Sequence, residues 1–420
     1  MRRWILIVMA ICLWSGWLTV EASPQSESLT LERCVSIALE KNPLIHSSQQ
    51  LVEASLARVH QAKAWDQPSL DIDSDLQPRL MDLKRSGESY LGFSQNLPFP
   101  GKRSLRGKIA SKEVAEVRFD VELLKLDIIL QVKQAFFDLL LAQEKYAYAE
   151  QDLNLAKDFL NKARLKHEAG GVAQVEVLRA RVEASKAANS LQSASNGKIL
   201  ARARLNFLMA RKKYDPLEVA GNLKRIILDL SPDDLKAKAL IFRPEIGRIN
   251  ASMEKESLKK DLGSLGYWPD FNLGLSRHRL EGQKTTWDFT FSIPIPLFFW
   301  QPQQGEIAEA RAMLLSLQKD HEHLKNTILL EVEEAALSAL TAGRQIRLFE
   351  EEILTQAEEV YNMMLFSYQE GEIGGIELIE ARRTLIEARK SYADALCNYS
   401  VALAVLERSV GRPIEGGTHD

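Results

Sequence analysis

Cysteine is scarce in this sequence of 420 residues, where it occurs three times, at positions 12, 34 and 397. So few cysteines exclude a disulfide-stabilised scaffold. A strong basic excess is also missing, because 54 lysine and arginine residues stand against 57 acidic residues and the formal net charge is −3. Nucleic-acid-binding proteins usually carry such an excess, so the charge does not favour that class.

Catalytic and metal-binding motifs are missing as well. The sequence contains no HExxH, P-loop, GxGxxG or CxxC motif. His321 and His323 flank Glu322, but a spacing of two places the histidines on different faces of a helix. We therefore expect no enzymatic activity, no metal site and no cofactor.

Proline is absent from two long stretches, 101–215 and 303–412. Both are rich in alanine, leucine, glutamate, lysine and glutamine, which favour helices, whereas proline would interrupt them. A helix over 101–168 would be about 100 Å long at 1.5 Å per residue, which exceeds a globular radius. We predict an elongated antiparallel helical bundle. A two-stranded coiled coil is the alternative, but no heptad pattern extends along the whole segment.

The N-terminus has the pattern of an export signal. Residues 1–3 (MRR) are basic, 4–20 are uncharged and largely apolar, and 20–22 (VEA) form a small-x-small cleavage site. We predict that the signal peptide 1–22 is removed. A permanent anchor is the alternative, although the apolar run is marginal for a membrane-spanning helix. After export, Cys34 and Cys397 could form a disulfide or remain buried thiols.

The two halves of the chain repeat one another at a shift of 201 residues. The segment GGVAQVEVLRAR (170–181) aligns with GEIGGIELIEAR (371–382), and Pro43 aligns with Pro244. Between these blocks the shift becomes 196, which aligns Phe93 with Phe289. Each half is predicted to contain a helix, two short strands, a very long helix, a glycine turn and a return helix.

This repeat defines the predicted domain organisation, in which a linker separates two structural repeats. The first repeat covers 23–213, with a helix over 31–64, strands near 68–77 and 89–98 and a tip near 170. An equatorial linker covers 214–243. The second repeat covers 244–412, with a helix over 244–264, strands near 269–277 and 286–295 and a tip near 371, and a C-terminal tail over 413–420 follows.

The four short segments alternate between apolar and polar residues, which predicts strands with one face of each kind. In 69–76, Asp71, Asp73 and Asp75 lie opposite the apolar positions, and Asp288 has the same place in 287–293. Tryptophans at the strand ends are typical of a membrane interface, whereas a half-buried soluble sheet is the alternative. Four strands leave two open edges, which lipid does not tolerate. Closure therefore requires several copies of the chain.

In a membrane barrel built from several copies, the polar faces of the strands would line a water-filled lumen. The acidic row would therefore lie inside that lumen. Rings of carboxylates favour cations, although an ordinary hydrophilic lining is the alternative. We take Asp71, Asp73, Asp75 and Asp288 as the candidate pore-lining residues.

These features together resemble the TolC-like outer membrane efflux protein family over essentially the whole mature chain. The motifs that carry the resemblance are LTLERCVSIALEKNP (29–43), LPFPGKRSLRG (97–107), FSIPIPLF (291–298), QGEIAEARA (304–312) and the two glycine-containing tips. The resemblance implies a mainly α fold with a small membrane β-barrel, in which a homotrimer completes a 12-stranded barrel and a long α-helical barrel. It also implies a periplasmic adaptor and an inner-membrane pump as partners. The strand exits look closest to the heavy-metal branch.

The resemblance further implies that the tips contact the adaptor. The tip residues it indicates are Gly170, Val175, Leu178, Ala180, Arg181, Gly371, Ile376, Ile379, Ala381 and Arg382. Hairpin turns followed by packed helix starts would account for the same residues without a partner. The predicted function is a passive exit duct of a tripartite exporter in the outer membrane. The alternatives are a periplasmic coiled-coil adaptor or scaffold, and a type I secretion duct.

Overall fold

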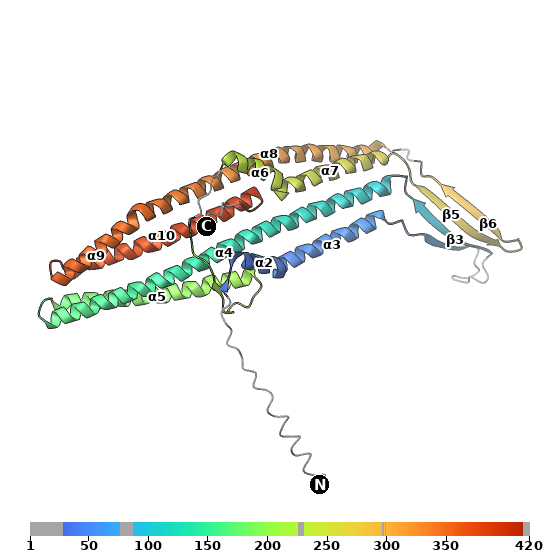
Figure 1. Cartoon of the computed structure of the whole chain (residues 1–420). Coiled ribbons are helices and arrows are strands. Elements are labelled where there is room, and N and C mark those ends of the chain that lie inside the picture. The colour runs from blue at the N-terminus through green and yellow to red at the C-terminus, as the bar shows by residue number, and fades with distance from the viewer. Residues whose placement is uncertain (1–27, 76–86, 226–230, 296–297, 299, 415–420) are drawn as a thin grey trace, which may run out of the picture.

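The computed structural model describes residues 28–75, 87–225, 231–295, 298 and 300–414. The predicted signal peptide, most of the segment between the first two predicted strands and most of the C-terminal tail lie outside the described residues. The molecule is elongated, with long helices over most of its length and a sheet at one end (Figure 1). The mainly helical fold with four longer strands confirms the predicted fold class.

The first half contains all the predicted elements. Its helices and strands are, in chain order, β1 (Ser28–Leu29), α2 (Leu31–Lys41), α3 (Pro43–Lys63), β2 (Ser69–Asp75), β3 (Glu88–Leu97), α4 (Lys102–Glu168) and α5 (Gln174–Leu208). Helix α4 has 67 residues and is therefore about 100 Å long.

The second half repeats this order. Its elements are β4 (Glu218–Val219), α6 (Pro232–Phe242), α7 (Pro244–Leu265), β5 (Phe271–Leu280), β6 (Thr286–Ser292), α8 (Trp300–Leu348), the π-helical turn η1 (Phe349–Ile353), α9 (Leu354–Glu370) and α10 (Gly375–Val410). Helices α8 and α9 with the π-helical turn between them correspond to the single helix α4. The short strands β1 and β4 pair in parallel and connect the halves.

The helix predicted over 31–64 is in fact two helices that meet at Asn42. This residue has extended backbone angles, and its side chain accepts a hydrogen bond from Leu44 N at 2.9 Å. Pro43 follows at the first helical position, where its missing N–H is not needed. The sequence reasoning overlooked this Asn-Pro boundary.

Helix α6 lies inside the segment predicted as a linker. Its bounds, Pro232–Phe242, equal those of α2 shifted by the same 201 residues that relate Pro43 to Pro244. The α6–α7 junction thus repeats the α2–α3 junction. The second repeat therefore begins before residue 244, because its first helix is α6, which lies within the segment predicted as a linker.

Four strands form one antiparallel sheet in the order β2-β3-β5-β6. Their bounds differ from the predicted ones by at most three residues; β5 continues to Leu280 rather than 277, and β6 ends at Ser292 rather than 295. Between them, residues 281–285 form the connecting turn, which is shorter than the segment 278–285 left between the two predicted strands. Strands β2 and β6 are the edges.

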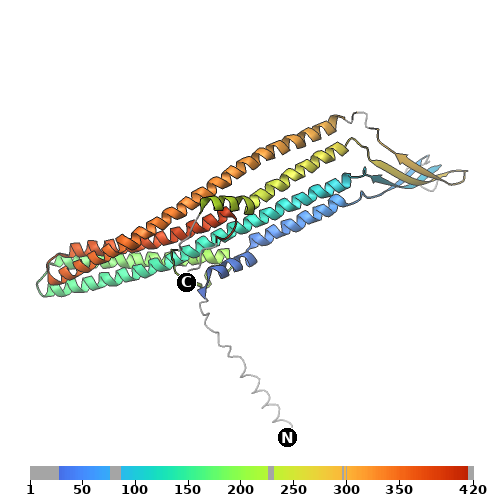
Figure 2. The ribbon, with the colours of Figure 1, turned by 45° about the horizontal axis from the view of Figure 1, so that its top comes forward.

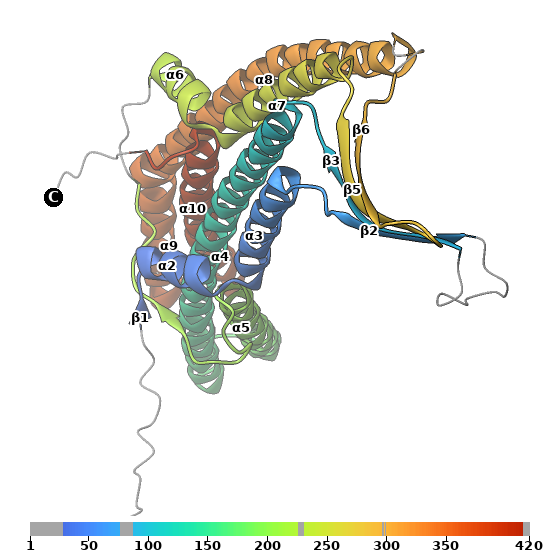
Figure 3. The same ribbon diagram turned by 90° about the vertical axis from the view of Figure 1, so that its right-hand side faces the viewer.

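The sheet continues into an arc of four helices. Helices α3, α4, α7 and α8 each pack against the next and run side by side away from the sheet (Figures 2 and 3). Beyond the middle of the molecule, α5 and α10 flank α4 toward the opposite tip. No helix among the described residues is both long and apolar enough to cross a membrane.

Apolar clusters hold the helices together at the middle of the molecule. One contains buried residues of α2, α4 and α5, including Cys34, and another contains residues of α6, α8 and α10. Cys397 of α10 is also buried, with 3% of its surface exposed. The two cysteines are free and buried, so the alternative of unpaired thiols holds. Burial raises the pKa of Cys34 to about 11 and that of Cys397 to about 12, which leaves both thiols protonated and unreactive.

Candidate functional site

The four predicted pore-lining aspartates lie on one face of the sheet. On β2, Asp73 pairs with Tyr90 and Asp75 pairs with Glu88. Asp71 accepts a hydrogen bond from Ser94 Oγ at 2.7 Å. Side chains at every second position of a strand share a face, so the acidic row continues across β3.

A polar cluster at the end of this face joins three strands. His278 Nε2 lies 2.8 Å from Glu88 Oε1, and His278 Nδ1 lies 3.6 Å from Asp288 Oδ2. The Tyr90 hydroxyl donates to Glu88 Oε1 at 2.5 Å, and its ring stacks on His278 with centroids 4.2 Å apart. Sequence reasoning missed Glu88 and His278 because it placed both in loops. Continued alternation past residue 277 could have revealed His278.

The opposite face of the sheet is apolar and exposed. Ile72 is 66%, Phe93 62% and Phe289 72% accessible to solvent. Leu91, Leu275 and Phe291 share this face and are also at least half exposed. Water-soluble monomers rarely show such a continuous apolar surface, so this face is expected to meet another apolar phase.

The acidic side chains of this sheet do not converge on one point. Within the described part of the chain, no group of three or more histidine, cysteine, aspartate or glutamate side chains has the geometry to hold a metal ion. The aspartate row follows the strand, which spreads its carboxylates along the face instead of converging them. The arrangement can attract cations over a surface but does not form a coordination shell.

A partly buried ion pair connects the sheet to the helices. Lys102, at the start of α4, donates to Asp270 Oδ1 and to the Trp268 carbonyl, both at 2.8 Å. Phe99 N donates to the same carboxylate at 2.8 Å. Burial opposes ionisation of Asp270, but these hydrogen bonds and the charge of Lys102 hold its pKa below the ordinary value. The contact holds the segment that leaves β3 against the segment that enters β5.

At the opposite end of the molecule, each predicted tip turns at a glycine. Gly170 has φ +78° and Gly371 has φ +84°, a conformation that a side chain would strain. A small apolar cluster packs the two hairpins together behind these turns, with Phe159 of α4 and Tyr368 of α9 at its centre. The Tyr368 hydroxyl donates to Glu176 of α5 at 2.8 Å.

The ten predicted tip residues divide by exposure. The exposed ones are Gly170, Val175, Leu178, Arg181, Gly371 and Ile376. Four are buried within the protomer, namely Ala180, Ile379, Ala381 and Arg382. A buried side chain offers no surface to a partner, so the expectation of direct contact does not hold for these four in this conformation. Ala180 and Ile379 belong to the apolar cluster, and Arg382 contacts α4 and α5 of the other hairpin.

Arg382 is the centre of an ion-pair network that sequence reasoning did not anticipate. Its guanidinium contacts Asp152 of α4 and, at 3.1 Å, Glu183 of α5. Arg383 donates to the same Glu183 at 2.6 Å. Burial opposes the charge of Glu183, but hydrogen bonds from Arg383 and Lys186 hold its pKa below the ordinary value. The network ties the two hairpins together.

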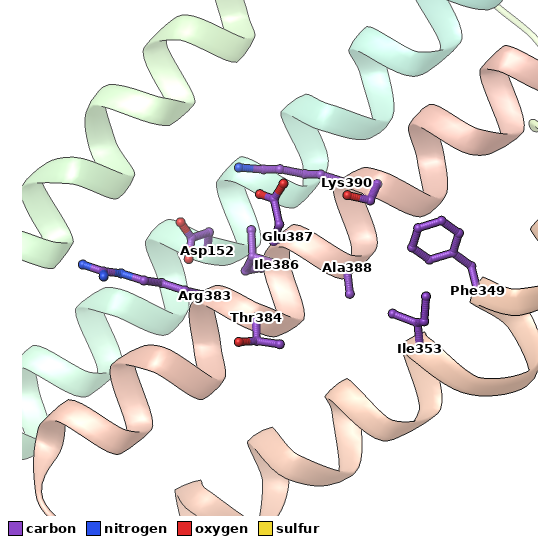
Figure 4. A pocket seen from close by; sticks show the side chains of 10 residues that line it. Asp152, Phe349, Ile353, Arg383, Thr384, Ile386, Glu387, Ala388 and Lys390 are labelled. Carbon is purple, nitrogen blue, oxygen red and sulfur yellow. The ribbon is translucent and has the colours of Figure 1, made fainter. Parts of the chain in front are cut away.

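An open cleft of about 660 Å³ lies beside this network. The charged residues Asp152 of α4 and Arg383, Glu387 and Lys390 of α10 line it together with Phe349 and Ile353 of the π-helical turn, which lie on the other side in Figure 4. The lining therefore carries charges of both signs next to apolar side chains. It contains no converging set of groups that would select one ligand.

Comparison with known proteins places this architecture among channels. The sequence profile described as "Outer membrane efflux protein" matches residues 34–211 and 237–412. The cobalt-zinc-cadmium resistance protein CzcC of Cupriavidus metallidurans is 25% identical over 391 residues, which cover 91% of this chain and 90% of that protein.

Solved structures share the fold. The CmeC outer membrane channel of Campylobacter jejuni superposes with a TM-score of 0.76 at 17% identity, covering 92% of this chain and 86% of that one. The MtrE outer membrane channel of Neisseria gonorrhoeae, in its open state, gives a TM-score of 0.75 at 16% identity, covering 93% of this chain and 91% of that one.

Proposed function

The chain belongs to the outer membrane efflux protein family, and from this premise we propose that three copies form one passive duct that releases heavy-metal cations. Members of the family act in tripartite systems with a periplasmic adaptor and an inner-membrane pump. The chain is thus an outer-membrane efflux channel with a periplasmic helical extension and not an enzyme. The energy for export comes from the pump.

The observation that carries the proposal is the sheet with one exposed apolar face and one acidic face. Exposed apolar area costs about 25 cal/mol per Å² in water, a cost that lipid removes. An apolar outer face with a polar inner face is the pattern of an outer-membrane barrel with a wet lumen. The side chains of Phe289 and Asp288, adjacent in β6, would then face lipid and lumen respectively.

The edges of the sheet support assembly from several copies. Within the described residues, β2 and β6 each have one neighbour in the sheet. Because each of the three strand pairs between them is antiparallel, β2 and β6 run in opposite directions. Strand β6 of one copy can therefore pair in antiparallel fashion with β2 of the next. Bacterial barrels have eight or more strands, and a homotrimer would have 12. Leu51 of α3 and Leu315 of α8 are 57% and 63% exposed at the matching edges of the helical arc.

The cargo is inferred from charge. In a trimer, Asp71, Asp73 and Asp75 would supply nine lumenal carboxylates, and Asp288 three more. Such rings favour cations over anions. The named activity of the relative CzcC, resistance to cobalt, zinc and cadmium, points in the same direction. Divalent metal ions are therefore the proposed cargo. The helix ends at the tip would close the duct at rest, and docking of a partner would shift the population toward the open state.

Adaptor docking is proposed at the exposed part of the tips. Val175 and Ile376 are equivalent positions of the two repeats and are 52% and 50% exposed, and Leu178 is 50% exposed. Apolar side chains beside exposed glycine turns suit the apolar end of a helical hairpin. The exposed residues Gly170, Arg181 and Gly371 complete the proposed surface.

A deletion strain tests the cargo. Its growth is measured across divalent and monovalent metals and a matched panel of organic toxicants, together with cell-associated metal. We expect selective sensitivity to divalent metals, with metal accumulation, that the intact gene reverses. Sensitivity to organic compounds alone would remove the metal cargo and leave the duct. A purified chain that is monomeric and soluble without detergent would instead support a periplasmic scaffold and overturn the duct.

Complementation with variants then tests the acidic row. The triple variant Asp71→Asn/Asp73→Asn/Asp75→Asn is expected to restore growth on metals poorly, while Asp234→Asn, an exposed position on α6, restores it fully. Equal complementation by both would show that the row is an ordinary hydrophilic lining. Both variants must reach the outer membrane in wild-type amounts.

A further inference from the structure

Two arginines interrupt the apolar face of the sheet near the end farthest from the helices. Arg277 and Arg279 are exposed residues of β5. The strand register places Arg277 between Leu91 of β3 and Trp287 of β6, and Arg279 beside Ser89. The two guanidinium groups therefore share the face of the exposed leucines and phenylalanines.

The acidic residues of the same strands lie on the other face. Neither Arg277 nor Arg279 forms an ion pair with any residue in the described ranges, whereas His278 between them contacts two carboxylates. The carboxylates of the four strands alternate with the apolar positions, and they are Asp71, Asp73, Asp75, Glu88 and Asp288. Within the described residues, the strand carboxylates therefore lie on the opposite face from the two arginines, and Glu281, in the turn after Arg279, forms no ion pair with either of them.

Their position along β5 sets their depth. Arg279 follows Phe271 by eight residues, which corresponds to about 27 Å of strand at ~3.4 Å per residue. With a strand tilt of about 40°, the height is about 20 Å, close to that of an apolar band of about 25 Å. An arginine facing lipid is costly at the midplane and nearly tolerated at the interface. Arg277 lies one row deeper, and its long stem can bring its charge to the same level.

We propose that Arg277 and Arg279 bind the phosphomonoester headgroup of an outer-leaflet lipid. Side chains two apart on a strand point the same way with Cα atoms about 7 Å apart, so both guanidinium groups can contact one phosphate. The planar guanidinium forms paired hydrogen bonds with phosphate oxygens, and a phosphomonoester dianion balances two positive charges. Trp287 beside Arg277 adds an interfacial ring. The inference rests on the proposed placement of the sheet in the membrane.

Lipid titration of the purified full-length protein in detergent tests this site. The probe is fluorescent lipid A with two phosphomonoesters, compared with phosphatidylglycerol, which has one phosphodiester. We expect R277Q/R279Q to weaken lipid A binding at least about tenfold, and R277K/R279K to weaken it less. The matched control K284Q, an exposed basic residue in the turn between β5 and β6, is expected to bind as wild type does.

Three results would overturn the inference. They are unchanged lipid A affinity in R277Q/R279Q, equal affinity of the wild type for phosphatidylglycerol, and displacement of lipid A by inorganic phosphate at equal concentration. Each variant is first checked for outer-membrane fractionation and an SDS-resistant oligomer, and R279Q alone replaces the double variant if the latter does not assemble. Absence of the wild type from the outer membrane would refute the proposed function, whereas lipid binding independent of the arginines refutes only this inference.

Discussion

Individual residues at equivalent places in the two repeats have different environments. Arg181 and Arg382 align in sequence, but Arg181 is exposed and Arg382 is buried between Asp152 and Glu183. The repeat predicted that the positions correspond, not that one hairpin covers the other. Asp152 lies 230 positions from Arg382, and no local pattern indicates such a distant partner. This is why the tip turns could be predicted and their ion-pair network could not.

The first prediction concerns this buried arginine. Removing one partner of a buried ion pair typically costs about 3–5 kcal/mol, because the remaining charges stay desolvated. Arg382→Ala is therefore expected to lower hydrogen-exchange protection at the tip ends of α5 and α10 by about two orders of magnitude or more. Arg181→Ala, at the exposed equivalent position, should stay within about 0.5 kcal/mol of wild type. Similar losses in both variants would contradict a special role for the network.

A second prediction concerns pH. Glu245 of α7 accepts hydrogen bonds from Arg243 and Arg408, both at 3.1 Å. Burial opposes its charge, but these contacts lower its pKa below the ordinary 4.5. A lowered folded-state pKa stabilises the fold above pH 4.5, and that stabilisation is lost as pH falls through the folded-state value.

Thermal midpoints from pH 7 down to about pH 2 measure this effect, because the stabilisation is lost below pH 4.5. The wild-type midpoint should fall in the acidic part of this range, and Glu245→Gln should start lower and fall less steeply there. The control Glu254→Gln, which changes a side chain that is 58% exposed, should follow the wild-type slope. A parallel slope for Glu245→Gln would show that other groups dominate the acid response.

At the scale of helices and strands, composition and period predicted the elements well, and boundaries less well. The proline-free stretches gave the long helices, and alternation gave all four strands of the sheet, because these signals are local. The break at Asn42 and helix α6 were missed. Each depends on a short Xaa-Pro junction that is stabilised by contacts with distant helices. At the first junction, Asn42 Nδ2 donates a hydrogen bond to the Leu208 carbonyl at 3.1 Å.

That junction gives the third prediction. Asn42 is 5% exposed, and it caps α3 while bonding to the end of α5. Asn42→Ala removes both interactions and should destabilise the α2–α3 junction by about 1–2 kcal/mol, measured as faster hydrogen exchange there. Thr30→Ala removes a cap whose hydrogen bond to Arg33 N is exposed and 3.4 Å long, so its effect should be near the lower limit of about 0.5 kcal/mol. An equal effect would mean that the Leu208 contact adds nothing.

At the scale of the whole molecule, the internal repeat and the two open edges of the sheet predict that several copies of the chain assemble. The sequence predicted a chain that cannot close its own sheet, and the structure places the edges at β2 and β6. The way that copies meet could not be predicted, because it depends on surfaces shared between chains. What the alternation does determine is which face of each strand can tolerate lipid.

The fourth prediction separates those two faces with neighbouring substitutions. Phe289 and Thr290 are adjacent exposed residues of β6, on the apolar and polar faces respectively. An arginine near the middle of a lipid-facing strand costs about 2–4 kcal/mol, whereas a lumenal one remains hydrated. Phe289→Arg is thus expected to lose most of the SDS-resistant oligomer from the outer-membrane fraction, and Thr290→Arg to retain it. Loss in Thr290→Arg with retention in Phe289→Arg would reverse the assignment of the faces, and with it the location of the acidic row.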